Sequence, residues 1–167
     1  FTKMGVPGFF RWLVNRYPLI RRRMSDPSRP KFNHLYIDCN GILYRAVEIA
    51  KPKTNHITEQ FVAEFLRYLD TLVQICRPTD TLFIAVDGCA PSAKNVQQRS
   101  RRFKAAQEMH EGSFDRCNFT PGTAFMDEIN DRLMEFIKEK KQTDEAWRAP
   151  KVIYSSSFVP GEGEHKI

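Results

Sequence analysis

Four acidic residues of this chain lie where an apolar run stops or a glycine turn begins, and carboxylates in such places can hold metal ions. Asp38 directly follows the run Leu-Tyr-Ile, and Asp87 follows Leu-Phe-Ile-Ala-Val. Glu162 and Glu164 alternate with glycines in the segment 161–166. Carboxylate oxygens are the ligands that Mg²⁺ and Mn²⁺ prefer. We therefore predict a divalent-metal site built from these four acids.

A purely structural role is the alternative for the same residues. Asp38 and Asp87 each open a sequence that favours a turn, Asp-Cys-Asn-Gly and Asp-Gly. Gathered carboxylates repel one another unless cations neutralise them, so four together favour a metal site over four turn caps. On a regular helix Glu162 and Glu164 would diverge by about 200°, whereas a glycine turn lets both face one site. The adjacent His165 is either an acid–base group or, as the sequence favours, a surface or supporting residue.

The composition indicates a phosphate-bearing substrate for such a site. The 167 residues carry 26 Lys and Arg against 20 Asp and Glu, a formal net charge of +6. An acidic cluster within a basic chain is typical of an enzyme that cleaves a polyanion, and paired divalent ions promote phosphodiester hydrolysis. Neither a phosphate-binding glycine loop of the Walker type nor a serine or cysteine nucleophile site is recognisable.

A second set of polar residues follows Asp87 at helical spacing. Lys94, Gln98, Arg101 and Arg102 fall at i, i+4, i+7 and i+8 of a helix that begins near position 91, so they share one face. The planar arginine side chain and the lysine charge suit a terminal phosphate. A solvated charged face is the alternative, and the nearby aspartate favours phosphate binding.

The pattern of apolar residues predicts a single three-layer α/β domain with a mostly parallel sheet flanked by helices. Helices are expected at 8–17, 58–77, 91–109 and 123–141, and strands at 34–38, 82–87 and 152–155. In such sheets the ligand crevice lies beyond the carboxyl ends of the strands, where both aspartates would be.

Four cysteines without a close pair favour reduced thiols in an intracellular protein, in cytoplasm or nucleus. No membrane contact is expected.

Six segments in order resemble the Xrn/Rat family of 5′→3′ exoribonucleases. They include Met-Gly-Val-Pro near the start, Leu-Tyr-Ile-Asp with Asn-Gly-Ile, and Ala-Val-Asp-Gly with Ala-Pro. Gln-Gln-Arg-Ser-Arg-Arg-Phe, Thr-Pro-Gly-Thr with Phe-Met, and Val-Pro-Gly-Glu-Gly-Glu-His-Lys-Ile follow. The segments span nearly the whole chain, so the resemblance is specific.

The resemblance implies a 5′-nuclease or PIN-like fold that is incomplete in this chain, and an enzyme that depends on Mg²⁺ or Mn²⁺. Its substrate would be single-stranded RNA with a 5′ monophosphate, degraded processively to mononucleotides. The family's metal and catalytic acids match Asp38, Asp87, Glu162 and Glu164. Its 5′-phosphate pocket, which has no room for a triphosphate or cap, matches Lys94, Gln98, Arg101 and Arg102. Tyr44 stands where the family usually has a histidine that stacks on the terminal base.

The resemblance also implies that residues 1–167 are the N-terminal part of a catalytic domain. Further metal-binding aspartates are expected downstream, and without them the segment should barely turn over. Two other functions remain open from the residues. One is a structure-specific nuclease that cuts 5′ flaps of DNA, and the other is a non-catalytic RNA-binding homologue.

Overall fold

The computed structural model describes residues 6, 8–21, 30–50, 57–107 and 114–167, without the side chains at 93, 101 and 104–106. The chain divides into two units, Phe1–Lys31 and Phe32–Ile167. The first unit holds helix α1 (Phe9–Arg16), which confirms the helix predicted there, and a 3-10 helix η1 (Pro18–Ile20).

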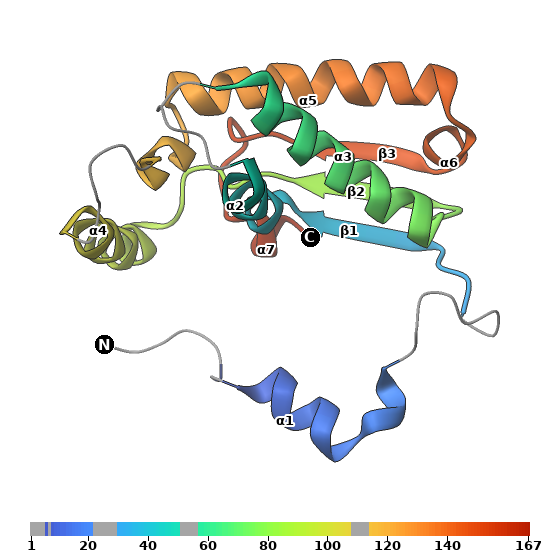
Figure 1. Cartoon of the computed structure of the whole chain (residues 1–167), viewed down its shortest axis with the longest axis horizontal. Helices are drawn as coiled ribbons and strands as arrows, with labels where there is room; N and C mark the ends of the chain where they lie inside the picture. Colours follow the sequence, from blue (N-terminus) through green and yellow to red (C-terminus); the bar gives the residue numbers. More distant parts are fainter. Residues whose placement is uncertain (1–5, 7, 22–29, 51–56, 108–113) are drawn as a thin grey trace. The chain divides into compact units, whose positions relative to one another are not determined.

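The second unit is built on a three-stranded parallel sheet, as predicted (Figure 1). Its strands are β1 (His34–Asp38), β2 (Thr81–Ala85) and β3 (Lys151–Ser155), in that spatial order. Asp38 pairs with Ala85, and Ala85 pairs with Ser155, so all three strands end at one level. Segments that follow the strands therefore begin side by side at this edge of the sheet.

Helices cover one face of the sheet and complete the core. They are α2 (Cys39–Ala50), α3 (Glu59–Cys76) and α5 (Ala124–Thr143), whose apolar stripes are buried (Figure 1). Thr58 and Thr123 begin α3 and α5 as N-caps, each accepting a hydrogen bond from a backbone N–H in the first turn. The core includes Ile37, Leu43, Phe61, Phe65, Leu69, Leu82, Ile84, Met126, Ile129, Leu133 and Trp147. The predicted α/β fold is confirmed.

Three helices differ from the sequence-based expectation. The helix α2 directly follows β1 and was missed, although Cys39, Ile42, Leu43 and Ala46 show the helical repeat. Its Asn-Gly pair is a turn signal that masked this repeat. The helices α6 (Glu145–Arg148) and α7 (Gly163–Lys166) are single turns, too short for periodicity to reveal.

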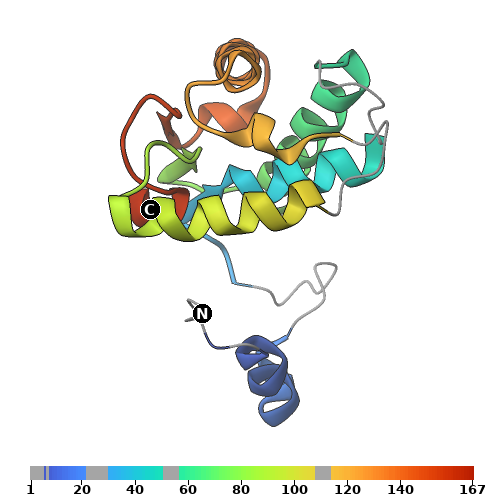
Figure 2. The same ribbon diagram turned by 90° about the vertical axis from the view of Figure 1, so that its left-hand side faces the viewer.

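The remaining elements lie beside the carboxyl edge of the sheet. Helix α4 (Ser92–Gln107) agrees with the helix predicted from 91, whose last predicted residues lie outside the described part of the chain. A 3-10 helix, η2 (Arg116–Phe119), precedes α5. Figure 2 shows α7 beside the first turns of α4. No helix among the described residues is long and apolar enough to cross a membrane.

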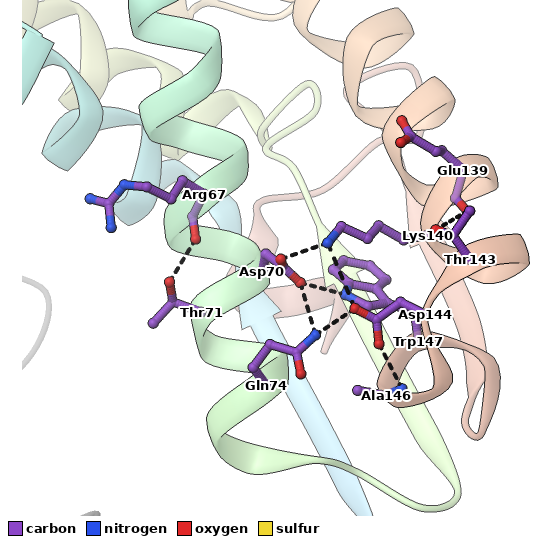
Figure 3. A network of polar contacts seen from close by, with 10 residues as sticks. All are labelled: Arg67, Asp70, Thr71, Gln74, Glu139, Lys140, Thr143, Asp144, Ala146 and Trp147. Carbon is purple, nitrogen blue, oxygen red and sulfur yellow. Dashed lines mark hydrogen bonds and ion pairs between the residues drawn. The ribbon is translucent and has the colours of Figure 1, made fainter.

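A polar network centred on Asp70 joins α3 to α5 and α6 (Figure 3). Asp70 accepts hydrogen bonds from Trp147 Nε1 at 2.8 Å, Lys140 Nζ at 2.6 Å and Gln74 Nε2 at 3.3 Å. Burial raises the pKa of Asp70, but these donors outweigh it and leave the pKa below its ordinary value. The carboxylate therefore stabilises the packing of the three helices when it is ionised.

Asp70→Asn should lower the free energy of unfolding by about 1–2 kcal/mol at pH 7, because the charge-assisted bonds are lost. Since folding depresses the pKa of Asp70, its contribution is present above the ordinary carboxyl pKa of about 3.9 and disappears as pH falls through the folded value. Urea unfolding at pH 7 and pH 3 measures both effects.

A matched control for this prediction is Glu48→Gln, which removes an exposed ion pair with Arg45. It should change the unfolding free energy by less than about 0.5 kcal/mol. A difference between Asp70→Asn and the unmodified protein that is the same at both pH values would contradict the proposed role of the charge.

Candidate active site

Two aspartates meet at the carboxyl edge of the sheet, and one asparagine holds both. Asp38 is the last residue of β1, whereas Asp87 lies two residues beyond β2. The Asn40 side chain donates to Asp87 Oδ2 at 2.7 Å and accepts from the Asp87 backbone N–H at 3.1 Å. The Asn40 backbone N–H donates to Asp38 Oδ1 at 3.2 Å. The buried Asn40 thus fixes the relative position of the two carboxylates.

The glycine-rich segment 161–166 brings further acids to the same place. Glu162 is the N-cap of α7 and has an extended backbone (φ −74°, ψ 154°), so helical geometry does not set its direction relative to Glu164. The Gly163 backbone N–H donates to Asp87 Oδ1 at 2.6 Å. A Cβ atom at Gly163 would lie 2.5 Å from Asp38 Oδ1, closer than real Cβ contacts allow. A side chain at this position would have to displace the Asp38 carboxylate, so glycine preserves the close approach to both aspartates.

A set of backbone contacts fastens this segment to the sheet. The N–H of Gly88 donates to the carbonyl of Gly161 at 2.8 Å, and the N–H of Gly161 donates to that of Cys89 at 2.9 Å. The Lys166 ammonium donates to the carbonyls of Val86 at 2.7 Å and Ser156 at 2.9 Å, which follow β2 and β3. The position of Glu162 is therefore set by the ends of two strands.

Glu162 is the buried acid of the site, 6% exposed. Its Oε1 accepts a hydrogen bond from Gln98 Nε2 at 3.1 Å, and its Oε2 lies 3.2 Å from Lys94 Nζ. Oε2 is buried, and the described residues give it this ion pair but no well-directed hydrogen bond. Glu164 is largely exposed, and its Oε1 lies 3.7 Å from the same Lys94 Nζ. The Nδ1 atom of His165 lies 3.5 Å from Glu162 Oε2.

The electrostatics of Asp87 show that the acids are crowded. Burial raises the pKa of Asp87, and the negative charges of Asp38 and Glu162 raise it further. The hydrogen bond from Gly163 and the charge of Lys166 oppose this shift without cancelling it. The protein therefore holds Asp87 at a cost that a bound cation would relieve.

These residues fit a divalent cation. The negative charges of Asp38 and Glu162 both act on Asp87. Ligand atoms of Glu162, Glu164 and His165 lie within 4.8 Å of one another. The structure thus places Asp87 within electrostatic reach of Asp38 and Glu162, and Glu164 next to Glu162. The close set of ligand atoms found among the described residues contains neither aspartate. The buried, incompletely bonded Oε2 of Glu162 is suited to a metal ligand. His165 is an additional ligand candidate that the sequence left as a supporting residue.

The predicted phosphate face of α4 adjoins the acids. Lys94 and Gln98 both contact Glu162, and Arg102 Nη2 lies 3.5 Å from Gln98 Oε1. The side chain of Arg101 lies outside the described residues. Lys94 offsets part of the acidic charge, because it is within 4 Å of both Glu162 and Glu164. The cationic face and the acidic cluster are therefore directly connected.

Tyr44, on α2, is close enough to both the acids and the cations to be influenced by their charges. Its ring is 40% exposed and packs edge-on against Phe119, with centroids 5.2 Å apart. Burial raises the pKa of Tyr44, Asp87 adds to the shift, and Arg116 and Arg102 oppose it. The phenol is thus within electrostatic reach of both the aspartate and α4.

Sequence reasoning gave no role to three neighbours of the site, Asn40, Lys166 and Arg116. Asn40 and Lys166 each stand two residues beyond a predicted metal ligand, which is a usable signal for residues that orient ligands. Arg116 is distant in sequence from every predicted site residue, so only the folded chain reveals it.

Comparison with known proteins identifies the family. The model that describes the N-terminus of XRN 5′-3′ exonucleases matches residues 4–167. The chain belongs to this family. Over 98% of its length it is 39% identical to 5′-3′ exoribonuclease 1 of Schizosaccharomyces pombe and 35% identical to that of Homo sapiens. It is 37% identical to the 5′-3′ exoribonuclease 2 homologue of Drosophila melanogaster, again over 98%. This XRN chain spans 14%, 11% and 23% of those three relatives.

The close approach at Gly163 gives a sharp test of the site in this XRN protein. Gly163→Ala should weaken Mn²⁺ binding by about tenfold or more, because the added methyl displaces Asp38 or α7. Its backbone φ is not positive, so the clash is the only expected cause. Isothermal titration calorimetry measures the change.

Gly41→Ala is the matched control, since a Cβ atom there would meet nothing within 4 Å. It should leave Mn²⁺ affinity unchanged and stabilise α2 slightly. Equal Mn²⁺ affinity in the two variants would contradict the importance of the Gly163–Asp38 approach.

Proposed function

We propose that the protein containing this chain is a 5′→3′ exoribonuclease that degrades 5′-monophosphorylated, single-stranded RNA processively to mononucleotides with Mg²⁺ or Mn²⁺. The observation that carries the proposal is the position of Glu162. Its carboxylate belongs to the acidic cluster and also contacts Lys94 and Gln98 on the cationic face of α4. A phosphate at α4 would therefore lie beside the acids, as cleavage near a 5′ end requires.

Metal ions held by Asp38, Asp87, Glu162 and Glu164 would activate water and stabilise the leaving oxygen. The chain's own residues position those acids. Asn40 and the Gly163 N–H orient Asp87, while Gln98 orients Glu162. These donors direct the carboxylates before substrate arrives, so little reorganisation is needed.

Recognition of the 5′ end is assigned in this proposal to Lys94, Gln98, Arg101 and Arg102. A monophosphate there would form an ion pair with Lys94, whose ammonium is now paired with Glu162 and Glu164. Tyr44 offers an exposed aromatic surface near these residues, which suits stacking of the terminal base. Together they would select a phosphorylated, unpaired end.

The relatives' names support the reaction, since they are called 5′-3′ exoribonucleases. Because the chain spans less than a quarter of each of them, we also propose that residues 1–167 form the N-terminal part of a catalytic domain. Further metal-binding aspartates would then come from the downstream part, and the segment alone would have little activity.

Asp87→Ala in the complete protein should lower the rate on 5′-monophosphorylated RNA with Mg²⁺ by at least about a hundredfold, because a metal ligand is lost. Asp80→Ala, at the opposite end of β2, is the matched control and should retain activity. Nucleotide release from end-labelled RNA measures the rate.

Two further substrates separate the alternatives in the same assay. RNA with a 5′ hydroxyl should be degraded more slowly than the monophosphorylated form, and a flapped DNA duplex should be cut poorly. Faster cleavage of the flap would favour a structure-specific DNA nuclease. RNA binding without metal-dependent turnover in the complete protein would indicate a non-catalytic homologue.

A further inference from the structure

Three side chains from three different elements form a cluster next to the acids, which we call the arginine–tyrosine cluster. It consists of Tyr44 on α2, Arg102 on α4 and Arg116 on η2. The guanidinium carbon of Arg116 lies 5.7 Å from the centroid of the Tyr44 ring, within cation–π range. Arg116 is exposed, and Tyr44 and Arg102 are partly exposed. The cluster is accessible to a ligand.

The position of Arg116 is well defined by its surroundings. The turn η2 is capped by Asp115, whose carboxylate accepts a hydrogen bond from the Cys117 N–H at 2.8 Å. At its other end Phe119 packs within 6.3 Å of the rings of Phe61, Phe114 and Phe125, and also contacts Tyr44. The same aromatic packing thus supports Tyr44 and the short helix that carries Arg116.

The cluster is positively charged. In the described part of the chain, neither Arg102 nor Arg116 forms an ion pair with a carboxylate. Both charges act on the Tyr44 phenol, and Arg102 also acts on the Cys117 thiol. An aromatic ring flanked by guanidinium groups is how many proteins bind single-stranded nucleic acid.

We propose that Arg116 binds a phosphate of the RNA backbone next to the base that stacks on Tyr44, and that this contact is separate from the terminal-phosphate site on α4. The proposal rests on the proposed function. Lys94 and Gln98 contact Glu162, so a phosphate bound by them lies at the acids. Arg116 contacts Tyr44 instead and comes from a different element. We therefore assign Arg116 to a different phosphate, the next one along the strand.

The test measures affinity of the complete protein for a short oligoribonucleotide, with Ca²⁺ replacing Mg²⁺, at several salt concentrations. The oligonucleotide carries either a 5′ monophosphate or a 5′ hydroxyl. Arg116→Gln should weaken binding about fivefold with both ends and reduce the slope of log affinity against log salt by about 0.7, as expected for one lost phosphate contact on a single strand. Arg116→Lys should retain the slope.

Two other variants complete the design. Tyr44→Ala should weaken binding by about fivefold or more, and this loss should vanish when the terminal nucleotide lacks its base. Lys151→Gln removes an exposed charge at the start of β3, the opposite edge of the sheet, and should change neither affinity nor slope.

The outcomes distinguish this inference from the function on which it rests. If the unmodified protein binds the RNA but Arg116→Gln has the same affinity and slope, the inference is wrong while the proposed function stands. If the loss occurs only with the 5′ monophosphate, Arg116 belongs to the terminal-phosphate site and the separate contact is refuted. If the unmodified protein binds neither oligonucleotide, the proposed function fails and this inference fails with it.

Discussion

Mutual repulsion among gathered carboxylates is the constraint on which the rest of this structure depends. Glu162 is buried and Asp87 partly buried, whereas Asp38 and Glu164 are exposed. Burial and the charges of Asp38 and Glu162 all raise the pKa of Asp87, and Glu162 is only 6% exposed. The fold compensates with directed donors, namely the Asn40 amide, the Gly163 N–H and the Gln98 amide. Lys94 supplies a counter-charge. Gathering these carboxylates reduces stability unless a cation binds. The fold nevertheless holds them near one another, which argues for a functional site.

The backbone is shaped around this constraint. The three parallel strands end at one level, so the segments after β1 and β2 deliver their aspartates together. A side chain at Gly163 would displace the Asp38 carboxylate. Gly88 is confined more strictly, because a Cβ atom there would lie 1.9 Å from the Val159 backbone carbonyl oxygen. Lys166 then ties the segment to the ends of β2 and β3. The core helices pack against the sheet, and the strand ends of the sheet position the aspartates.

Much of this could be predicted from the sequence, for reasons that particular elements make clear. The helix α3 has a long apolar stripe, a threonine cap and a following proline, and all of these signals are local. The strands β1 and β2 are apolar runs, and the parallel-sheet rule places Asp38 and Asp87 at one edge. The helix α2 was missed because Asn-Gly is a local turn signal that tertiary packing overrides. The contacts of Asn40 with Asp87 and of Arg116 with Tyr44 could not be predicted, because each joins segments distant in sequence. For Asn40 the sequence offered only its spacing from Asp38 as a signal. The assignment of metal and phosphate ligands stays a prediction.

The central claim is that the crowded carboxylates hold a divalent cation. Glu162 is central to it, because this residue acts on Asp87 together with Asp38 and also lies close to Glu164 and His165. The most direct test is Mn²⁺ binding to the complete protein by titration calorimetry, comparing Glu162→Gln with Glu139→Gln, an exposed glutamate on α5. The account predicts that Glu162→Gln weakens Mn²⁺ binding by about tenfold or more, while Glu139→Gln has no effect. Undiminished Mn²⁺ affinity in a folded Glu162→Gln protein would contradict it.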